Sequence, residues 1–107
     1  MAYVFVQDVA ASWEQYERAV GALADPAPPG LIVHVAGPTD EGVRIIDVWE
    51  SKDSWERFRA EFLAPAIAAL GGPSRPEATF RDLHPEHLWL TEAPASRPRG
   101  RYAKEER

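Results

Sequence analysis

A chain of 107 residues has room for one domain with a single hydrophobic core. Hydrophobic residues make up 45% of it and charged residues 27%, a balance typical of folded globular proteins and unlike that of disordered chains. Cysteine is absent, which excludes disulfides, thiol nucleophiles and thiolate metal sites and fits a reducing cytoplasm.

Charge is divided unevenly along the chain, whose net charge is −5. Residues 1–92 carry 7 Lys and Arg against 15 Asp and Glu, whereas residues 93–107 carry 5 against 2. An acidic body repels phosphate backbones, so no nucleic-acid partner is expected. We expect residues 1–92 to form a single domain and residues 93–107, rich in Pro, Arg and Ser, to form a flexible basic tail.

The N-terminal residues lack the basic start and the long apolar stretch of a signal peptide. No apolar run elsewhere approaches the roughly 20 residues that span a bilayer. The sequence therefore predicts a cytoplasmic protein with no membrane association.

The first elements are a strand and a helix. Residues 3–9 predict a strand, because β-branched and aromatic side chains are packed into a short run. Ser12 opens a helix and is followed three residues later by Gln15, the pattern of a capping box. This helix must end before Pro26, because the prolines from there on cannot continue it. Its apolar stripe consists of Trp13, Tyr16, Val20 and Leu23.

Two further strands are predicted at residues 31–36 and 43–50, and the turn-forming residues 37–42 between them suit a hairpin. Ser51 can cap a second helix, in which Pro65 predicts a kink or a restart. The apolar positions of this helix are Trp55, Phe58, Phe62, Ile67 and Leu70, and the helix ends at Gly71-Gly72-Pro73. A fourth strand is expected at residues 77–83. It is followed by a short extension at residues 84–90, to which the sequence assigns no secondary structure.

The resulting order, β-α-β-β-α-β, predicts an α+β ferredoxin-like fold with a four-stranded antiparallel sheet and two helices on one face. Both faces of the predicted sheet are largely apolar: Leu31, Val33 and Val35 alternate with Ile32, His34 and Ala36. Because large exposed apolar patches are uncommon on monomers, we expect the second face to be buried in a homodimer. The alternative is that residues 88–90 (Leu-Trp-Leu) fold back over the sheet of their own chain.

Residues 31–39 (LIVHVAGPT) together with residues 42–51 (GVRIIDVWES) resemble the dimeric α/β-barrel superfamily, most closely its small antibiotic-biosynthesis-monooxygenase-like proteins. Phe58, Phe62, Leu63 and Pro65 are similar to the second helix of that group. The resemblance covers roughly residues 3–83 and implies a dimeric α/β barrel. The same scaffold hosts cofactor-free oxygenases, polyketide cyclases, lactone isomerases, haem-degrading enzymes and proteins without known activity.

This sequence lacks residues that the better-known branches of the superfamily use, and these differences limit which activities the resemblance implies. The chain contains no Asn, whereas haem-degrading and anthrone-oxidising members resemble each other in using a pocket Asn. Residues 52–70, the region that would supply an axial haem ligand, contain no His. The first strand has Tyr3, Phe5 and Gln7 where olivetolic-acid-type cyclases have a His. We therefore expect no haem. The catalytic residues of none of these enzymatic branches are all present in this sequence.

His34 is the leading catalytic candidate, because a mid-strand imidazole can act as acid or base near neutral pH. If the hairpin pairs around Ala36 and Val43, His34 shares a face with Asp47, which would orient it, and with Trp49, which would offer a flat wall to an aromatic ligand. A one-residue slip would instead set it beside Arg44, Ile46 and Glu50. The structural alternative is a His bonded within the sheet or the dimer interface.

Aromatic residues on the predicted helices face the sheet and either fill the core or line a pocket. The substrate-binding candidates are Tyr16, Trp49, Trp55, Phe58 and Phe62. His84 and His87 flank Glu86, but a zinc site needs more ligands and a rigid frame, so no metal is expected. Gly71-Gly72 precedes Pro73 rather than a helix start, so no nucleotide cofactor is expected either.

Two functional hypotheses follow. In the first, a homodimer binds an aromatic or polyketide-like small molecule and acts as a cofactor-independent monooxygenase, cyclase or isomerase, with His34 as base and Asp47 orienting it. In the second, the dimer is a non-catalytic binding or accessory protein whose aromatic residues are core. A cavity of a few hundred Å³ beside His34 favours the enzyme, and a filled core favours the second hypothesis.

Overall fold

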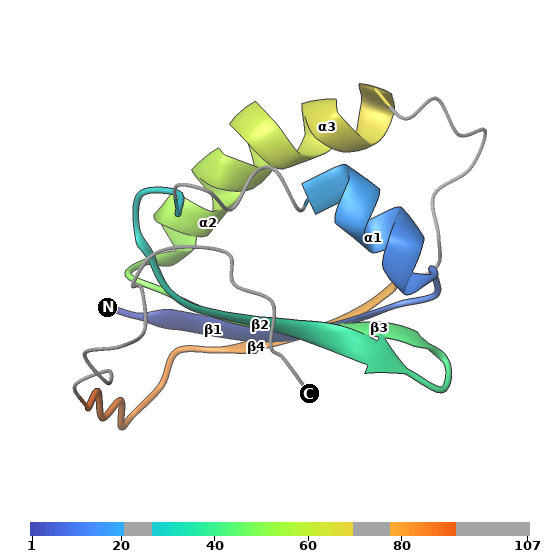
Figure 1. Cartoon of the computed structure of the whole chain (residues 1–107). Coiled ribbons are helices and arrows are strands. Elements are labelled where there is room, and N and C mark those ends of the chain that lie inside the picture. Colours follow the sequence, from blue (N-terminus) through green and yellow to red (C-terminus); the bar gives the residue numbers. More distant parts are fainter. Residues whose placement is uncertain (21–26, 70–77, 92–107) are drawn as a thin grey trace.

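The computed structural model describes residues 1–20, 27–69 and 78–91 (Figure 1). It has a four-stranded antiparallel sheet of order β2-β3-β1-β4, with the helices layered on one face (Figure 1). The elements are β1 (Tyr3–Val9), α1 (Trp13–Val20), β2 (Leu31–Thr39), β3 (Gly42–Trp49), α2 (Lys52–Phe58), η2 (Arg59–Leu63), α3 (Ala64–Ala69) and β4 (Ala78–Leu83). The predicted ferredoxin-like α+β fold is confirmed.

Both predicted helix starts are present. At α1, the Ser12 N–H donates to Gln15 Oε1 at 2.9 Å, and the Gln15 N–H donates to Ser12 Oγ at 3.1 Å. This reciprocal pair is a capping box, which satisfies backbone donors that the first turn leaves free. At α2, Ser51 Oγ accepts from the Ser54 N–H at 3.1 Å. The predicted end of the first helix falls on residues 21–26, outside the described residues.

The hairpin is tighter than the sequence analysis predicted. Residues 37–39 belong to β2, and Thr39 pairs with Gly42 across a two-residue turn at residues 40 and 41. Pro38 is tolerated in the strand because β2 lies at the edge of the sheet, where a missing N–H breaks no inner ladder. Gly42 has φ +151°, and a Cβ there would lie 2.1 Å from the Val9 carbonyl oxygen. The close approach of β1 therefore requires glycine at this position.

The alternation of side chains predicted for β2 is wrong at Leu31. The register shifts between Leu31 and Val33, so that Ile32 is an extra residue and Leu31 pairs with Trp49. A bulge of this kind reverses the facing of the residues before it. Leu31 consequently packs against the core on the helix side rather than sharing the outer face with Val33 and Val35.

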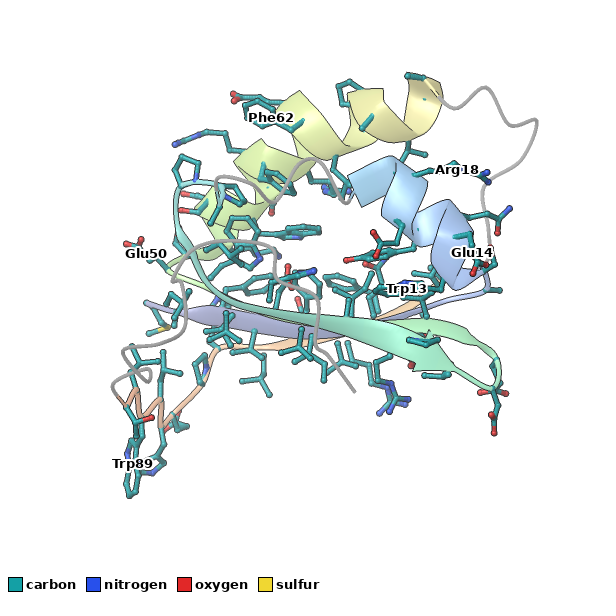
Figure 2. All side chains as sticks on the ribbon, in the orientation of Figure 1. Trp13, Glu14, Arg18, Glu50, Phe62 and Trp89 are labelled. Atoms are coloured by element: carbon teal, nitrogen blue, oxygen red, sulfur yellow. The ribbon has the colours of Figure 1, made fainter. Side chains whose placement is uncertain are left out.

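The second helical region changes pitch before Pro65. Residues 59–63 form the π-helical turn η2, in which the Ala64 N–H bonds to the Arg59 carbonyl five residues back. The extra residue in this turn rotates the inward-facing position from Phe62 to Leu63. Phe62 is 50% exposed and lies on the outer side of the helical layer (Figure 2), whereas Leu63 packs against the core. The predicted interruption near Pro65 is confirmed as this turn.

The core is aromatic and lies between β1, β3 and α2. Its fully packed members are Tyr3, Phe5, Trp49 and Trp55. The Phe5 and Trp55 ring centroids are 4.5 Å apart and the Trp49 and Trp55 centroids 5.7 Å apart. Such ring pairs each contribute about 0.5–1.5 kcal/mol beyond simple burial. The site described below is therefore built on a rigid frame.

The sheet face opposite the helices is uncovered in the described part of the chain. We call it the open face; its exposed apolar residues are Val33, Val35, Ile46 and Leu83. Trp89 is 86% exposed and projects beyond the sheet, away from the helices (Figure 2). The alternative in which residues 88–90 cover their own sheet is therefore wrong. No described helix is long and apolar enough to cross a membrane.

Candidate functional site

His34 and Asp47 meet across the β2–β3 ladder. They are direct cross-strand partners, and His34 Nδ1 lies 2.7 Å from Asp47 Oδ1. Side-chain alternation predicts that they share one face, and they do, although the ladder pairs Ala36 with Ile45 rather than with Val43. The side chain of Asp47 is 6% exposed and that of His34 is 24% exposed. The imidazole is thus the solvent-reachable end of a pair whose carboxylate is buried.

The second carboxylate oxygen of Asp47 is held by Trp49. The Trp49 indole N–H donates to Asp47 Oδ2 at 3.0 Å, because residues two apart on β3 point to the same face. An indole N–H is a donor only, so this oxygen is an acceptor. Asp47 therefore accepts at both oxygens, and its buried position is compensated by hydrogen bonds.

Tyr16 reaches the other side of the imidazole from α1. Its hydroxyl lies 2.9 Å from His34 Nε2, and its ring stacks on Trp13 at a centroid distance of 5.1 Å. Trp13 lies where α1 meets the sheet (Figure 2), and the capping box fixes where this helix begins. The structure thus brings the predicted residues Tyr16, His34, Asp47 and Trp49 into one hydrogen-bonded chain.

The positions of the hydrogen atoms follow from these partners. A carboxylate facing Nδ1 places the ring proton on that nitrogen, and 2.7 Å is typical of a charge-assisted bond. Nε2 of a neutral imidazole is then an acceptor, so the Tyr16 hydroxyl donates to it. In this state His34 is a base whose proton-accepting nitrogen points at a phenol.

A cavity of about 60 Å³ opens beside this chain of hydrogen bonds. Its polar lining comes from Gln7, Tyr16, His34 and Asp47, with the indole of Trp49 beside them. The rest of the lining is apolar: Phe5, Pro28, Leu31, Ile45, Trp55, Phe58 and Leu63. Among the residues that the structure describes, neither Lys nor Arg lines the cavity. The cavity therefore suits an uncharged, mostly apolar molecule that meets polar groups at one end.

Phe62 was predicted to line the pocket but does not, and several residues that line it were not predicted. Phe62 lies outside the cavity for the reason given above, and its ring stacks on Phe58 at 6.0 Å. Leu63 and Leu31 replace it, and neither the π-helical turn nor the β-bulge that directs them inward has a clear sequence signal. Gln7 was recognisable, because it continues the alternation of Tyr3 and Phe5 along β1.

A second polar pair lies outside the cavity. The Tyr3 hydroxyl donates to Asp82 Oδ2 at 2.5 Å, and the His84 ring lies 5.5 Å from the Tyr3 ring. Burial, followed by the hydrogen bond to Asp82, raises the pKa of Tyr3 above its usual range. His87 instead contacts Trp89, with ring centroids 6.4 Å apart. Among the described residues, no three His, Asp or Glu side chains are grouped closely enough to hold a metal ion.

Solved structures share this fold. SnoaB from Streptomyces nogalater, a cofactor-independent oxygenase, superposes in a mutant form with a TM-score of 0.60 and 18% identity over 81% of this chain and 95% of its own. A Deinococcus radiodurans protein, whose name places it among antibiotic biosynthesis monooxygenases, gives 0.61 and 14% over 87% and 100%. The protein YJCS, whose name states no activity, gives 0.54 and 11% over 79% and 98%.

These likenesses establish the fold alone, the ferredoxin-like α+β arrangement that this chain shares with those proteins. No family model matches the chain, and no curated protein matches it. Because one fold hosts many chemistries, the function has to be argued from the site itself.

Proposed function

We propose that this chain is a small-molecule enzyme that works as a homodimer and removes a proton from a weakly acidic substrate without a cofactor. The observation that carries the proposal is His34, held between the buried Asp47 carboxylate and the Tyr16 hydroxyl at the edge of an apolar cavity. A substrate that readily forms a carbanion or phenolate needs only a positioned base and a dry site.

Each residue of the site has a role in this proposal. His34 is the final proton acceptor, and Asp47 fixes its tautomer and stabilises the imidazolium that forms. Trp49 fixes Asp47, while Trp55 and Phe58 supply apolar walls. The substrate anion then isomerises, closes a ring, or reacts with dioxygen; in the oxygenase case one oxygen atom enters a new carbonyl group and the other leaves as water. SnoaB, with the same fold, supports the oxygenase branch.

The homodimer is supported by the open face. Val35 is 52% exposed on edge strand β2 and Leu83 is 54% exposed on edge strand β4, and the two inner strands add Val4, Val6, Ile46 and Val48 to the same face. A second copy packed on this face would remove these side chains from water, at roughly 25 cal/mol per Å² buried. Trp89 would then lie at the margin of the interface. We place this dimer in the cytoplasm, which the absence of cysteine supports.

The second candidate is a non-catalytic binding or accessory dimer, and the size of the cavity favours it. A benzene ring occupies an apolar cavity of about 150 Å³, whereas the cavity here has about 60 Å³. An aromatic substrate therefore requires the walls to move apart. Leu63 belongs to the π-helical turn, whose hydrogen bonding is already irregular, and is the wall most suited to yield.

Hydrogen–deuterium exchange separates the two candidates. The ketone 2-indanone has weakly acidic C–H bonds, and its exchange in D2O is followed by proton NMR. We expect the protein to accelerate this exchange, and His34→Ala and His34→Gln each to reduce the acceleration by about 10²–10⁴-fold. Equal acceleration by the protein and both variants would remove His34 from the chemistry and leave the binding role.

A further inference from the structure

We propose that the Tyr16 hydroxyl, rather than His34, is the group that exchanges a proton with the bound molecule, and that the molecule is uncharged with a weakly acidic C–H or O–H bond. His34 and Asp47 relay the proton behind it. This inference rests on the proposed function and identifies the residue that touches the substrate.

Both nitrogens of His34 are already engaged. Nδ1 faces Asp47 at 2.7 Å and Nε2 faces the Tyr16 oxygen at 2.9 Å. An imidazole in this position has no lone pair left for a ligand, because its one basic nitrogen accepts from Tyr16. Tyr16 and His34 both line the cavity, so a ligand there can bond the phenol oxygen, which accepts as well as donates, whereas the imidazole offers it no lone pair.

The order of the hydrogen bonds gives the direction of proton transfer. The Trp49 N–H and the His34 Nδ1–H both donate to Asp47, and the Tyr16 hydroxyl donates to Nε2. When the substrate's proton moves to the Tyr16 oxygen, the hydroxyl proton of Tyr16 moves to Nε2. The substrate keeps the electron pair of its broken bond and becomes an anion. Tyr16 ends neutral, and His34 ends as an imidazolium beside the Asp47 carboxylate, so charge and atoms balance.

The lining of the cavity sets the substrate class. The described lining residues include no Lys or Arg, so they supply no cation to neutralise a carboxylate or phosphate brought into the apolar interior. The one carboxylate of the described lining, Asp47, is occupied by His34 and Trp49 and would repel an anion. A neutral ketone or phenol enters without this cost and becomes charged only when it meets Tyr16.

A pair of Tyr→Phe variants tests the assignment by the 2-indanone exchange assay. Tyr16→Phe keeps the ring and removes the hydroxyl, whereas Tyr3→Phe removes a hydroxyl that bonds Asp82 outside the cavity. We expect Tyr16→Phe to lose about 10²-fold or more of the exchange rate, as His34→Ala does, and Tyr3→Phe to keep it. If Tyr16→Phe keeps or raises the rate while His34→Ala loses it, His34 acts directly, which overturns this inference and leaves the proposed function standing.

Binding of 4-nitrophenol gives a test that needs no turnover. Its neutral form, present at mildly acidic pH, is titrated into the protein and followed by absorbance and by protein NMR. We expect Tyr16→Phe to weaken its binding about tenfold, the loss of one hydrogen bond, and Tyr3→Phe to leave it unchanged. Equal affinity for the protein and Tyr16→Phe, or no binding to either, would overturn the assignment of Tyr16.

Discussion

His34 and Asp47 are direct partners across the β2–β3 ladder, with Nδ1 and Oδ1 2.7 Å apart, and the buried carboxylate sets the tautomer of the partly buried ring. Backbone pairing places the two residues opposite each other, and bonds from Tyr16 and Trp49 hold their side chains. The proposed proton-transfer site is thus supported by a rigid sheet and by surrounding hydrogen bonds.

Replacing Asp47 by Asn tests the orienting role. In Asp47→Asn the amide can turn its NH2 group toward Nδ1, which favours the opposite tautomer and places a proton on Nε2 against Tyr16. We expect proton exchange of 2-indanone to fall by about 10²-fold or more. The matched control is Asp82→Asn, which alters a carboxylate bonded to Tyr3 outside the cavity and should leave the rate unchanged. A rate equal to that of the unmodified protein in Asp47→Asn would exclude the orienting role.

The indole of Trp49 is predicted to stabilise the fold through Asp47. Trp49→Phe keeps an aromatic ring in the core but leaves Asp47 Oδ2 without its donor, at a cost of about 1–3 kcal/mol in addition to the lost packing. Urea denaturation followed by circular dichroism measures this. Trp55→Phe is the comparison, because it shortens a neighbouring core ring that does not bond Asp47. Equal losses in the two variants would show that the indole hydrogen bond contributes nothing.

Glycine is required at position 42 and dispensable at position 37. Gly42→Ala places a Cβ 2.1 Å from the Val9 carbonyl oxygen at φ +151°, and we expect it to reduce the free energy of unfolding by about 1–3 kcal/mol. Gly37→Ala adds a Cβ with nothing within 4 Å and should change stability by less than about 0.5 kcal/mol. The same denaturation experiment compares them. Equal stability of Gly42→Ala and Gly37→Ala would show that the tight hairpin does not require glycine at position 42.

Stability at alkaline pH should depend on Tyr3. Its pKa is raised in the folded state, mainly by burial, while in the unfolded chain it lies near 10.0. The unfolded state therefore loses the Tyr3 proton first, so the stabilisation is fully present below pH 10 and is lost as pH rises above it. Thermal unfolding from pH 8 to 11 should show a steeper decline in the unmodified protein than in Tyr3→Phe. Parallel declines would contradict the assigned pKa direction.

A charge on the open face should prevent dimer formation. Ile46→Glu places a carboxylate between its cross-strand partners Val35 and Val6, and in a face-to-face dimer this carboxylate would be buried. We expect analytical ultracentrifugation to show a dimer for the unmodified protein and a monomer for this variant. Phe62→Glu is the control, because Phe62 lies on the outer side of the helices (Figure 2). A dimer that survives Ile46→Glu would have to use another surface.

The sequence predicts local features well, but it predicts poorly how the helices pack on the sheet. The bounds of β1 and both serine caps follow from neighbouring residues, and period-two alternation suffices to put His34 and Asp47 on one face. The Tyr16–His34 bond depends on how α1 sits on the sheet, which no local pattern specifies. The facing of residues around the bulge and the π-helical turn could not be predicted for a related reason. One inserted residue changes the direction in which the neighbouring side chains point, and Leu63 rather than Phe62 therefore lines the cavity.

The most direct test of the site is the nitrogen NMR spectrum of the histidines, titrated with neutral 4-nitrophenol. The chain has only three His residues, and the spectrum of His34→Gln identifies the signals of His34. We expect His34 to carry its proton on Nδ1 and its signals to shift on binding, while those of His84 and His87 stay in place. A proton on Nε2, or His34 signals that do not move while the ligand binds elsewhere, would contradict the proposed site.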